Sequence, residues 1–266
     1  MDFIPSIVIL SGGAALVAIV GFTVVNRFMK PIDVDQHQGF LDAMLSIVGT
    51  LVSILLGLIV AASLDHYQAI EQSVDTEAAA ISQVIRLSTG LPKPVRKNLR
   101  RLAIDYGNLV INDEWPKMAQ GEPSEKVLLT LAELIGEISV YKPADNGESN
   151  LHAALLASVQ QAADCRRQRL LVMHSAWKDH LMPVLLLCSF IVLVFAFLYA
   201  KKGAILHCVL ICFVAIALGG NLGLIYLLSN PFSGDWKIQP RGFQLNAILQ
   251  NKLRAMPELQ RFANDD

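Results

Sequence analysis

The sequence predicts an all-α integral membrane protein with four transmembrane helices and a helical extramembrane bundle inserted between the second and third spans. Three observations lead to this fold class. Of the 266 residues, 53% are hydrophobic and only 17% are charged, and the mean hydropathy is +0.46, which is typical of a membrane protein. Four long stretches contain no Asp, Glu, Lys or Arg. The polar region between the second and third stretches has helical periodicity without strand-like alternation.

Each of the four apolar stretches reaches the roughly 20 residues that a helix needs to cross a bilayer. They cover residues 3–26, 43–64, 181–200 and 203–230. The first lacks the basic start and cleavage pattern of a removable signal sequence, so we expect a retained anchor. The four cysteines show no metal-ligand or redox spacing, and we expect small buried apolar residues there.

The region between the spans is expected to form four amphipathic helices. The first continues directly out of the second span and repeats apolar residues at Val74, Ala78, Ile81 and Ile85. Prolines in TGLPKP end it. The second is expected to end before Pro116, and the last to follow a turn in PADNGESN and to run unbroken into the third span. The expected helices cover residues 65–88, 95–114, 124–140 and 151–180.

This organisation divides the chain into four parts and places both termini and the extramembrane domain on one side of the membrane. The parts are residues 1–64, 65–180, 181–230 and 231–266. Basic residues near spans mark the cytoplasmic side, so the short loops would be cytoplasmic. Their basic residues are Arg27, Lys30, Lys201 and Lys202. A second basic group on the domain side opposes this assignment, and it consists of Arg166, Arg167, Arg169 and Lys178.

Polar and small residues gather on one face of the second span, at spacings of three and four. We call them the polar stripe: Asp42, Ser46, Gly49, Thr50, Ser53 and Gly57. Small residues at this spacing let helices approach closely in lipid. Alternatively, the face lines a narrow water-filled path in an oligomer, where hydroxyls and backbone replace part of the hydration of an ion. The opposite face, with Leu51, Ile54, Leu55, Leu58 and Ile59, is expected to meet lipid or apolar helices.

A second candidate feature is the run KPVRKNLRR at the start of the second extramembrane helix. We call its side chains the basic cluster: Lys93, Arg96, Lys97, Arg100 and Arg101. It is either a solvated helix surface or an electrostatic funnel that concentrates anions near a vestibule. A net charge of −1 and the absence of interleaved aromatic residues argue against nucleic-acid binding.

The histidines and carboxylates show no catalytic or metal-ligand spacing, so the sequence predicts neither an enzyme nor a metal or cofactor site. His207 lies within the fourth span, where an ionisable side chain is a functional candidate or faces water near the loop. In the same span Gly219 and Gly223 permit close helix contact, and Asn221 needs a polar partner or water. A turn is expected to end this span, formed by Asn230, Pro231, Phe232, Ser233, Gly234 and Asp235.

Three segments together resemble the bacterial bestrophin-like family of membrane proteins. They are LDHYQAIEQSVDTEAAAISQVIRL after the second span, LRRLAIDYGNLVINDEWPKMAQG in the domain, and NPFSGDWKIQP after the fourth span. The resemblance follows nearly the whole chain in order and spacing. Its most distinctive residues include Glu77-Ala78 after a tyrosine, Glu114-Trp115-Pro116, and Pro231-Phe232-Ser233-Gly234.

Bestrophins are pentameric anion channels in which the second membrane helix lines the pore, so the resemblance implies a homopentamer with the polar stripe near a central axis. It also implies a bacterial cytoplasmic membrane and a domain in the cytoplasm, against the charge rule. Two features depart from the family. Only Asp235 stands where several carboxylates would clasp calcium, and the aromatic constriction of the pore helix is missing.

Three functions are compatible with these observations. The first is an oligomeric channel for passive conduction of inorganic anions such as chloride, along a pore lined by the second span. The alternative is a non-conducting membrane scaffold or signalling protein that binds partners through its helical domain. A third is a stator-like proton channel, which the absence of a carboxylate deep within a span disfavours.

Overall fold

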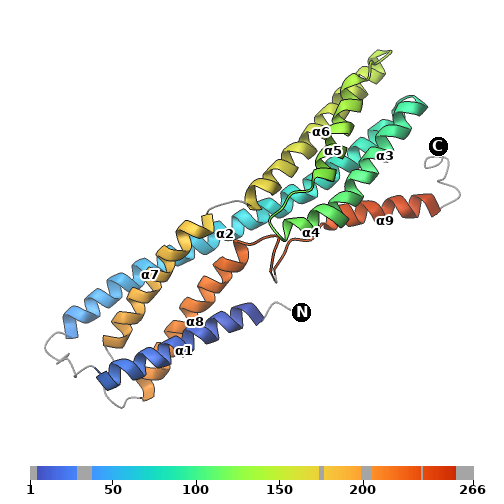
Figure 1. The fold of residues 1–266 in the computed structure, drawn as a ribbon. Coiled ribbons are helices and arrows are strands. Elements are labelled where there is room, and N and C mark those ends of the chain that lie inside the picture. The colour runs from blue at the N-terminus through green and yellow to red at the C-terminus, as the bar shows by residue number, and fades with distance from the viewer. Residues whose placement is uncertain (1–4, 29–37, 174–176, 199–204, 235, 256–266) are drawn as a thin grey trace. The chain divides into compact units, whose positions relative to one another are not determined.

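The computed structural model describes residues 5–28, 38–173, 177–198, 205–234 and 236–255, and within these ranges the chain forms helices and no strand (Figure 1). It divides into two compact units. Unit 1 comprises Met1–Tyr67 with Ala176–Trp236, and unit 2 comprises Gln68–Ser175 with Lys237–Asp266. The long helix α2 (Gln38–Leu87) contributes its first part to unit 1 and its second part to unit 2.

Unit 1 contains the apolar helices. Besides α2 these are α1 (Pro5–Phe28), α7 (Trp177–Leu198) and α8 (Ile205–Leu228). Three of the described helices are long and apolar enough to cross a membrane, namely those over Ile7–Val25, Asp42–Gly90 and Ile205–Leu228. The third expected span is represented by a shorter apolar helix, Leu181–Phe197. The four-span arrangement therefore stays a prediction, since residues 199–204 lie outside the described ones.

Close packing of α8 against α1 depends on the glycines singled out in the fourth span. A Cβ added at Gly219 would lie 2.6 Å from Ala14 Cβ and 3.2 Å from the Leu10 carbonyl oxygen. At Gly223 it would lie 3.2 Å from Leu10 Cδ1. The close helix contact predicted from this spacing is present, and it lies within one chain.

Unit 2 contains the polar helices, and two of their boundaries differ from expectation. They are the second part of α2, α3 (Lys93–Leu109), α4 (Trp115–Met118), α5 (Glu125–Val140), α6 (Asn146–Met173) and α9 (Arg241–Ala255). The chain stays helical past Pro116, because the π-helical turn η3 (Val110–Glu114) precedes it and Pro116 falls at the start of α4. A proline is tolerated in the first turn of a helix, because the N–H that it lacks would have no partner within that turn.

Helix α6 begins at Asn146, five residues before the expected start, because the predicted turn supplies its cap. Asp145 Oδ1 accepts a hydrogen bond from Glu148 N at 2.7 Å, and Glu148 Oε2 accepts one from Ala144 N at 2.8 Å. This reciprocal pair satisfies helix-end donors and starts the helix early. Residues 174–176 lie outside the described ones, as does the predicted unbroken passage into the third span.

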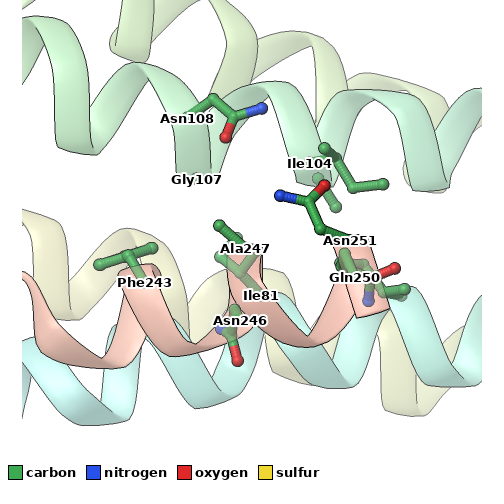
Figure 2. Close-up of a pocket in the computed structure, with 11 residues that line it drawn as sticks. Ile81, Ile104, Gly107, Asn108, Phe243, Asn246, Ala247, Gln250 and Asn251 are labelled. Atoms are coloured by element: carbon green, nitrogen blue, oxygen red, sulfur yellow. The ribbon is translucent and has the colours of Figure 1, made fainter. Parts of the chain in front are cut away.

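Helix α9 lies within residues 231–266, the last of the four parts, where no helix is predicted from the sequence. Trp115 Nε1 donates to the Ile238 carbonyl oxygen at 3.0 Å, and Phe243 packs on Tyr106 with ring centroids 6.3 Å apart. At Gly242 an added Cβ would lie 2.8 Å from Ala78 Cβ, so glycine permits the approach of α9 to α2. A cavity remains between α9, α2 and α3 (Figure 2).

Candidate functional site

The polar stripe lies on a face of α2 that the described part of its own chain leaves uncovered. Its side chains are exposed except at Gly49, which is half-buried. A Cβ added at Gly49 or Gly57 would meet nothing within 4 Å. Ser53 Oγ donates to the Gly49 carbonyl oxygen at 2.7 Å, which keeps its hydroxyl close to the helix surface. Helical spacing therefore brings the six residues to one accessible face.

A different face of the same helix packs inside unit 1. Val52 and Leu56 are buried with Leu185 and Val192 of α7 and Ile225 of α8. Of the apolar face expected to meet lipid or helices, Leu51, Ile54 and Leu58 are exposed, whereas Leu55 and Ile59 join this buried cluster. The first part of α2 thus has a packed face, an exposed apolar face and an exposed polar stripe.

The two polar residues singled out in the fourth span, Asn221 and His207, lie in different surroundings. Asn221 is exposed and its Nδ2 donates to the Ala217 carbonyl oxygen of its own helix at 2.9 Å. His207 is half-buried, and its Nδ1 has no hydrogen-bond partner among the described residues. Helix α8 ends at Leu228, before Asn230-Pro231 as predicted.

The turn after α8 is held by hydrogen bonds and by an apolar anchor. Asn230 Nδ2 donates to the Tyr226 carbonyl oxygen at 2.7 Å, and Ser233 N donates to the Asn230 carbonyl oxygen at 3.3 Å. Pro231 and Phe232 are buried, and Gly234 adopts a positive φ of 85° that favours glycine. Asp235 lies outside the described residues, as do Lys30, Lys201 and Lys202. Hydrogen bonds and the burial of Pro231 and Phe232 therefore hold the described part of this turn.

The basic cluster occupies the first turns of α3, where the positive end of the helix dipole adds to its charge. Part of this charge is already paired. Arg101 lies 3.5 Å from Asp105 Oδ2 and 3.6 Å from Glu133 Oε1, and Arg96 Nη1 donates to the Thr89 carbonyl oxygen at 3.3 Å. The Arg101 pairs are about half exposed, so water screens them and they contribute little to stability.

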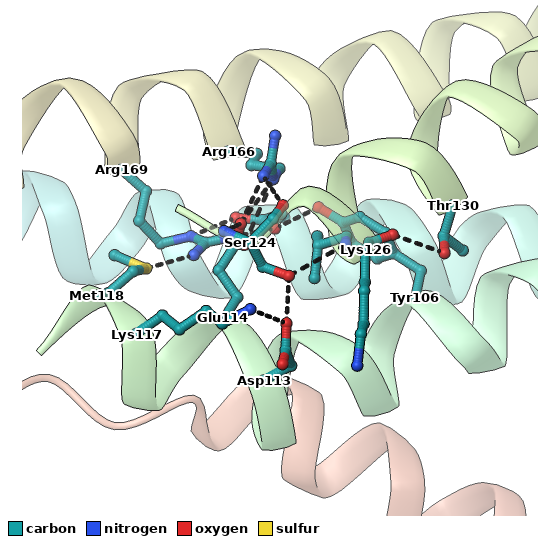
Figure 3. Close-up of polar contacts among 12 residues, drawn as sticks. Tyr106, Asp113, Glu114, Lys117, Met118, Ser124, Lys126, Thr130, Arg166 and Arg169 are labelled. Carbon is teal, nitrogen blue, oxygen red and sulfur yellow. Dashed lines mark hydrogen bonds and ion pairs between the residues drawn. The ribbon is translucent and has the colours of Figure 1, made fainter. Parts of the chain in front are cut away.

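Four buried charges form a cluster inside unit 2, which we call the ion cluster: Glu77, Glu114, Arg166 and Arg169 (Figure 3). Arg169 makes a two-pronged contact with Glu77, with Nε to Oε2 at 3.0 Å and Nη2 to Oε1 at 2.8 Å. Its Nη2 also lies 2.8 Å from Glu114 Oε2. Arg166 Nη2 donates to Glu114 Oε1 at 2.5 Å. The cluster therefore joins α2, η3 and α6.

Neighbouring groups complete the hydrogen bonds of the ion cluster. Tyr106 Oη donates to Glu77 Oε1 at 2.7 Å, and Arg166 Nη2 also reaches the Ser124 carbonyl oxygen at 3.2 Å. The guanidinium of Arg169 lies over the Trp115 ring, 5.1 Å from its centroid. Two positive and two negative charges balance, so the cluster carries no net charge. Satisfied in this way, it can hold three helices in register, but its carboxylates are not available as catalytic bases.

Burial and pairing change the ionisation of these groups. Burial raises the pKa of Tyr106, and the nearby Glu77 carboxylate raises it further. Burial alone would lower the pKa of Arg169, but Glu77 and Glu114 outweigh it and raise that pKa well above its ordinary value. At the edge of the group, Asp113 accepts hydrogen bonds from Ser124 and Lys117, which lower its pKa. All of these shifts favour the ionisation states in which the network is intact.

Two features of the sequence point to the ion cluster, but helical periodicity alone does not show that these residues pair with each other. Glu77 lies within the apolar repeat of α2, between Val74 and Ile81, where an acidic side chain is expected to need a buried partner. Arg166 and Arg169 are three residues apart, which places them on one side of α6. Glu77 and Arg169 are 92 residues apart, so their pairing follows only from the fold. Among the described residues, no group of three or more histidine, cysteine or acidic side chains could hold a metal ion.

Comparisons with known proteins relate this chain to a protein family and to solved structures. A model of the bestrophin-like domain matches residues 12–243. Two crystal structures of a bacterial bestrophin homologue from Klebsiella pneumoniae, each with a single substitution, align with TM-scores of 0.61 and 0.60 at 14% identity. The first alignment covers 95% of this chain and 97% of the homologue, and the second covers 97% and 98%. These likenesses establish the bestrophin-homologue fold.

A further crystal structure, of a membrane protein, aligns with a TM-score of 0.55 at 14% identity and covers 93% of this chain and 96% of that protein. No protein of curated function matches the sequence. At these identities the structural likeness concerns the fold alone.

Proposed function

Because the chain belongs to the bestrophin-like family and forms a multi-pass membrane protein, we propose that it assembles into an oligomeric channel for passive ion conduction. In this proposal the oligomer is a homopentamer in a bacterial cytoplasmic membrane. The first part of α2 surrounds a central pore. Its polar stripe faces that pore, and unit 2 is the vestibule.

The observation that carries the proposal is the exposure of the polar stripe in a chain that packs a different face of the same helix. In a lone chain these polar groups would face hydrocarbon, which offers no hydrogen-bond partners to hydroxyl or backbone groups. If copies of α2 surround an axis, the same groups meet one another or water. The exposed apolar face with Leu51, Ile54 and Leu58 is then free for lipid or a neighbouring helix.

Anions are the proposed permeant class, and inorganic chloride is the simplest case. Hydroxyl groups at Ser46 and Thr50 can donate hydrogen bonds without excluding negative charge, and the Ser53 hydroxyl can do so when it turns away from the Gly49 carbonyl oxygen. The basic cluster adds positive potential that raises the local concentration of anions. Asp42 is the one carboxylate of the stripe and opposes this preference, so replacing it should shift selectivity further toward anions.

Reconstitution in planar bilayers tests the proposal. Under a chloride gradient we expect a reversal potential near that of chloride, and Asp42→Asn should move it closer. Ser53→Leu should reduce conductance because it narrows the path. Ala62→Leu is the matched control, since Ala62 is an exposed small residue on another face of α2. Absence of conductance, cation selectivity, or equal effects of the two leucine variants would contradict it.

Oligomeric state supplies an independent test. The proposal predicts five copies and a continuous polar passage along their axis in a structure of the oligomer. An axis filled by packed side chains or lipid would favour a non-conducting scaffold that binds partners through its helical unit.

A further inference from the structure

The cavity between α9, α2 and α3 in unit 2 has an apolar lining and an uncharged polar rim (Figure 2). Its volume is about 80 Å³. Because one water needs roughly 10–15 Å³ by this kind of measure, the space holds several waters or one small organic molecule. The apolar lining includes Ile81 and Ile85 from α2, Ile104 from α3, and Phe243 and Ala247 from α9.

The polar part of the lining consists of carboxamides. They are Asn108 on α3 and Asn246, Gln250 and Asn251 on α9. Asn246 Nδ2 donates to the Ala78 carbonyl oxygen at 2.8 Å, so this side chain already ties α9 to α2. In Figure 2 the Asn251 side chain extends into the space between α9 and α3, beside Ile104. A ligand there would therefore meet an amide on an apolar background.

The charge of the lining limits the class of ligand. None of the eleven side chains that line the cavity is acidic or basic. An ion would lose hydration on entering without gaining a countercharge. A carboxamide offers both N–H donors and a carbonyl acceptor, so its natural partner is a group with the same pair. The apolar lining adds affinity for a short hydrocarbon portion.

We propose that this cavity is a binding site for a small uncharged molecule that carries an amide group on a short apolar body. The amide bonds with the carboxamide rim, and the hydrocarbon portion rests on the isoleucines and Phe243. Because the ligand contacts α9 on one side and α2 and α3 on the other, its binding holds α9 in its docked position. This site is distinct from the polar stripe and does not depend on ion conduction.

Isobutyramide and isobutyrate form a matched pair of probes, since they share one carbon skeleton and differ in charge. Saturation-transfer NMR with the full-length protein in detergent micelles should detect isobutyramide with a dissociation constant on the order of 1–10 mM, because so small a ligand makes few contacts. Isobutyrate should give no specific signal. Equal binding of the two would overturn the proposed preference for an uncharged ligand.

Two glycine variants separate occupancy of the cavity from general effects. Gly107→Ala adds a methyl group to the lining, with its Cβ 3.7 Å from Phe243 Cδ1, an ordinary contact that preserves the fold. Gly136→Ala on α5 places its Cβ where nothing lies within 4 Å and leaves the cavity unchanged. Both gain helix propensity. Because an added methyl group overfills a small space, we expect Gly107→Ala to weaken isobutyramide binding at least about fivefold. Gly136→Ala should leave the binding unchanged.

Hydrogen exchange provides a second readout. Saturating isobutyramide should slow amide exchange in α9, and Asn251→Leu should weaken both this protection and the binding. Two binding results would overturn the proposal. One is isobutyramide binding that Gly107→Ala leaves unchanged, and the other is no detectable binding at a 100-fold molar excess of isobutyramide over the protein. An oligomer structure with a neighbouring chain filling the cavity would also overturn it. A protein that binds isobutyramide but does not conduct would refute only the channel proposal, and the reverse result would refute only this one.

Discussion

The polar stripe of unit 1 and the ion cluster of unit 2 differ in how far their polar groups are buried and in which partners they have. In the stripe, the hydroxyls and Gly57 are exposed, Gly49 is half-buried, and no described residue packs on either glycine. In the ion cluster, full charges are buried and each has a charged partner within hydrogen-bond distance. The ion cluster therefore satisfies its charges within one chain, whereas the polar stripe stays accessible, as the proposed pore requires.

Arg169→Met should have the largest effect, because it leaves Glu77 buried without its two-pronged partner. Breaking a buried ion pair from one side costs about 3–5 kcal/mol. Denaturant unfolding of the solubilised protein, followed by circular dichroism, measures the loss. Arg167→Met is the control, since Arg167 is exposed on the same helix and should change stability by less than about 0.5 kcal/mol. Equal losses would show that the cluster does not stabilise unit 2.

Tyr106→Phe should have a smaller effect, because Glu77 keeps its contacts with Arg169 and loses only the tyrosine hydroxyl. A hydrogen bond to a charged group contributes about 1.5–3 kcal/mol. The same unfolding assay detects this change. Tyr226→Phe, at a position that is 52% exposed, is the control and should be nearly neutral. A neutral Tyr106→Phe would mean that the cluster is already satisfied without this hydroxyl.

Ser53→Leu should barely alter the stability of a single chain, with a change of less than about 0.5 kcal/mol, because its side chain is exposed. The same substitution is expected to reduce conductance in the proposed channel. Unfolding and bilayer recordings on one preparation measure both. A large loss of stability would show that the stripe has partners within the chain, and the contrast with the ion cluster would then disappear.

Tyr141 gives the mildest test, at the tip of the α5 and α6 hairpin. Its hydroxyl donates to Glu148, which raises the pKa of Tyr141 to about 12. Because the folded pKa lies above the unfolded value near 10, the contribution is fully present below pH 10 and is lost as pH rises through 12. The stability difference between wild type and Tyr141→Phe should therefore be constant below pH 10 and shrink above it. A difference that grows with pH in this range would contradict the assignment.

Much of the helical framework could be predicted from the sequence. The expected helix over residues 124–140 matches α5, because Ser124 caps it by accepting a hydrogen bond from Val127 N. The end of α8 before Asn230-Pro231 follows from the restriction that proline places on the preceding backbone. The early start of α6 was missed because a reciprocal cap overrides the turn composition of its first residues.

Of the candidate sites, the polar stripe could be predicted from the sequence and the cavity beside α9 could not. Spacing alone placed the polar stripe on one face of α2, since a helix of 3.6 residues per turn determines which side chains share a face. The positions of α9 and of the segment before it could not be read from spacing, because their contacts lie far away in the chain: Ile238 with Trp115 of α4, Phe243 with Tyr106 of α3 and Asn246 with Ala78 of α2.

Neighbouring residues alone predict most of the helices outside α9 and which of them suit a membrane, because both properties depend on local sequence and on transfer from water to hydrocarbon. The packed face of α2, the pairing of the buried charges and the position of α9 follow from the fold. These depend on distances between residues such as Glu77 and Arg169, and a buried charge is stable only where the fold brings its partner within hydrogen-bond reach.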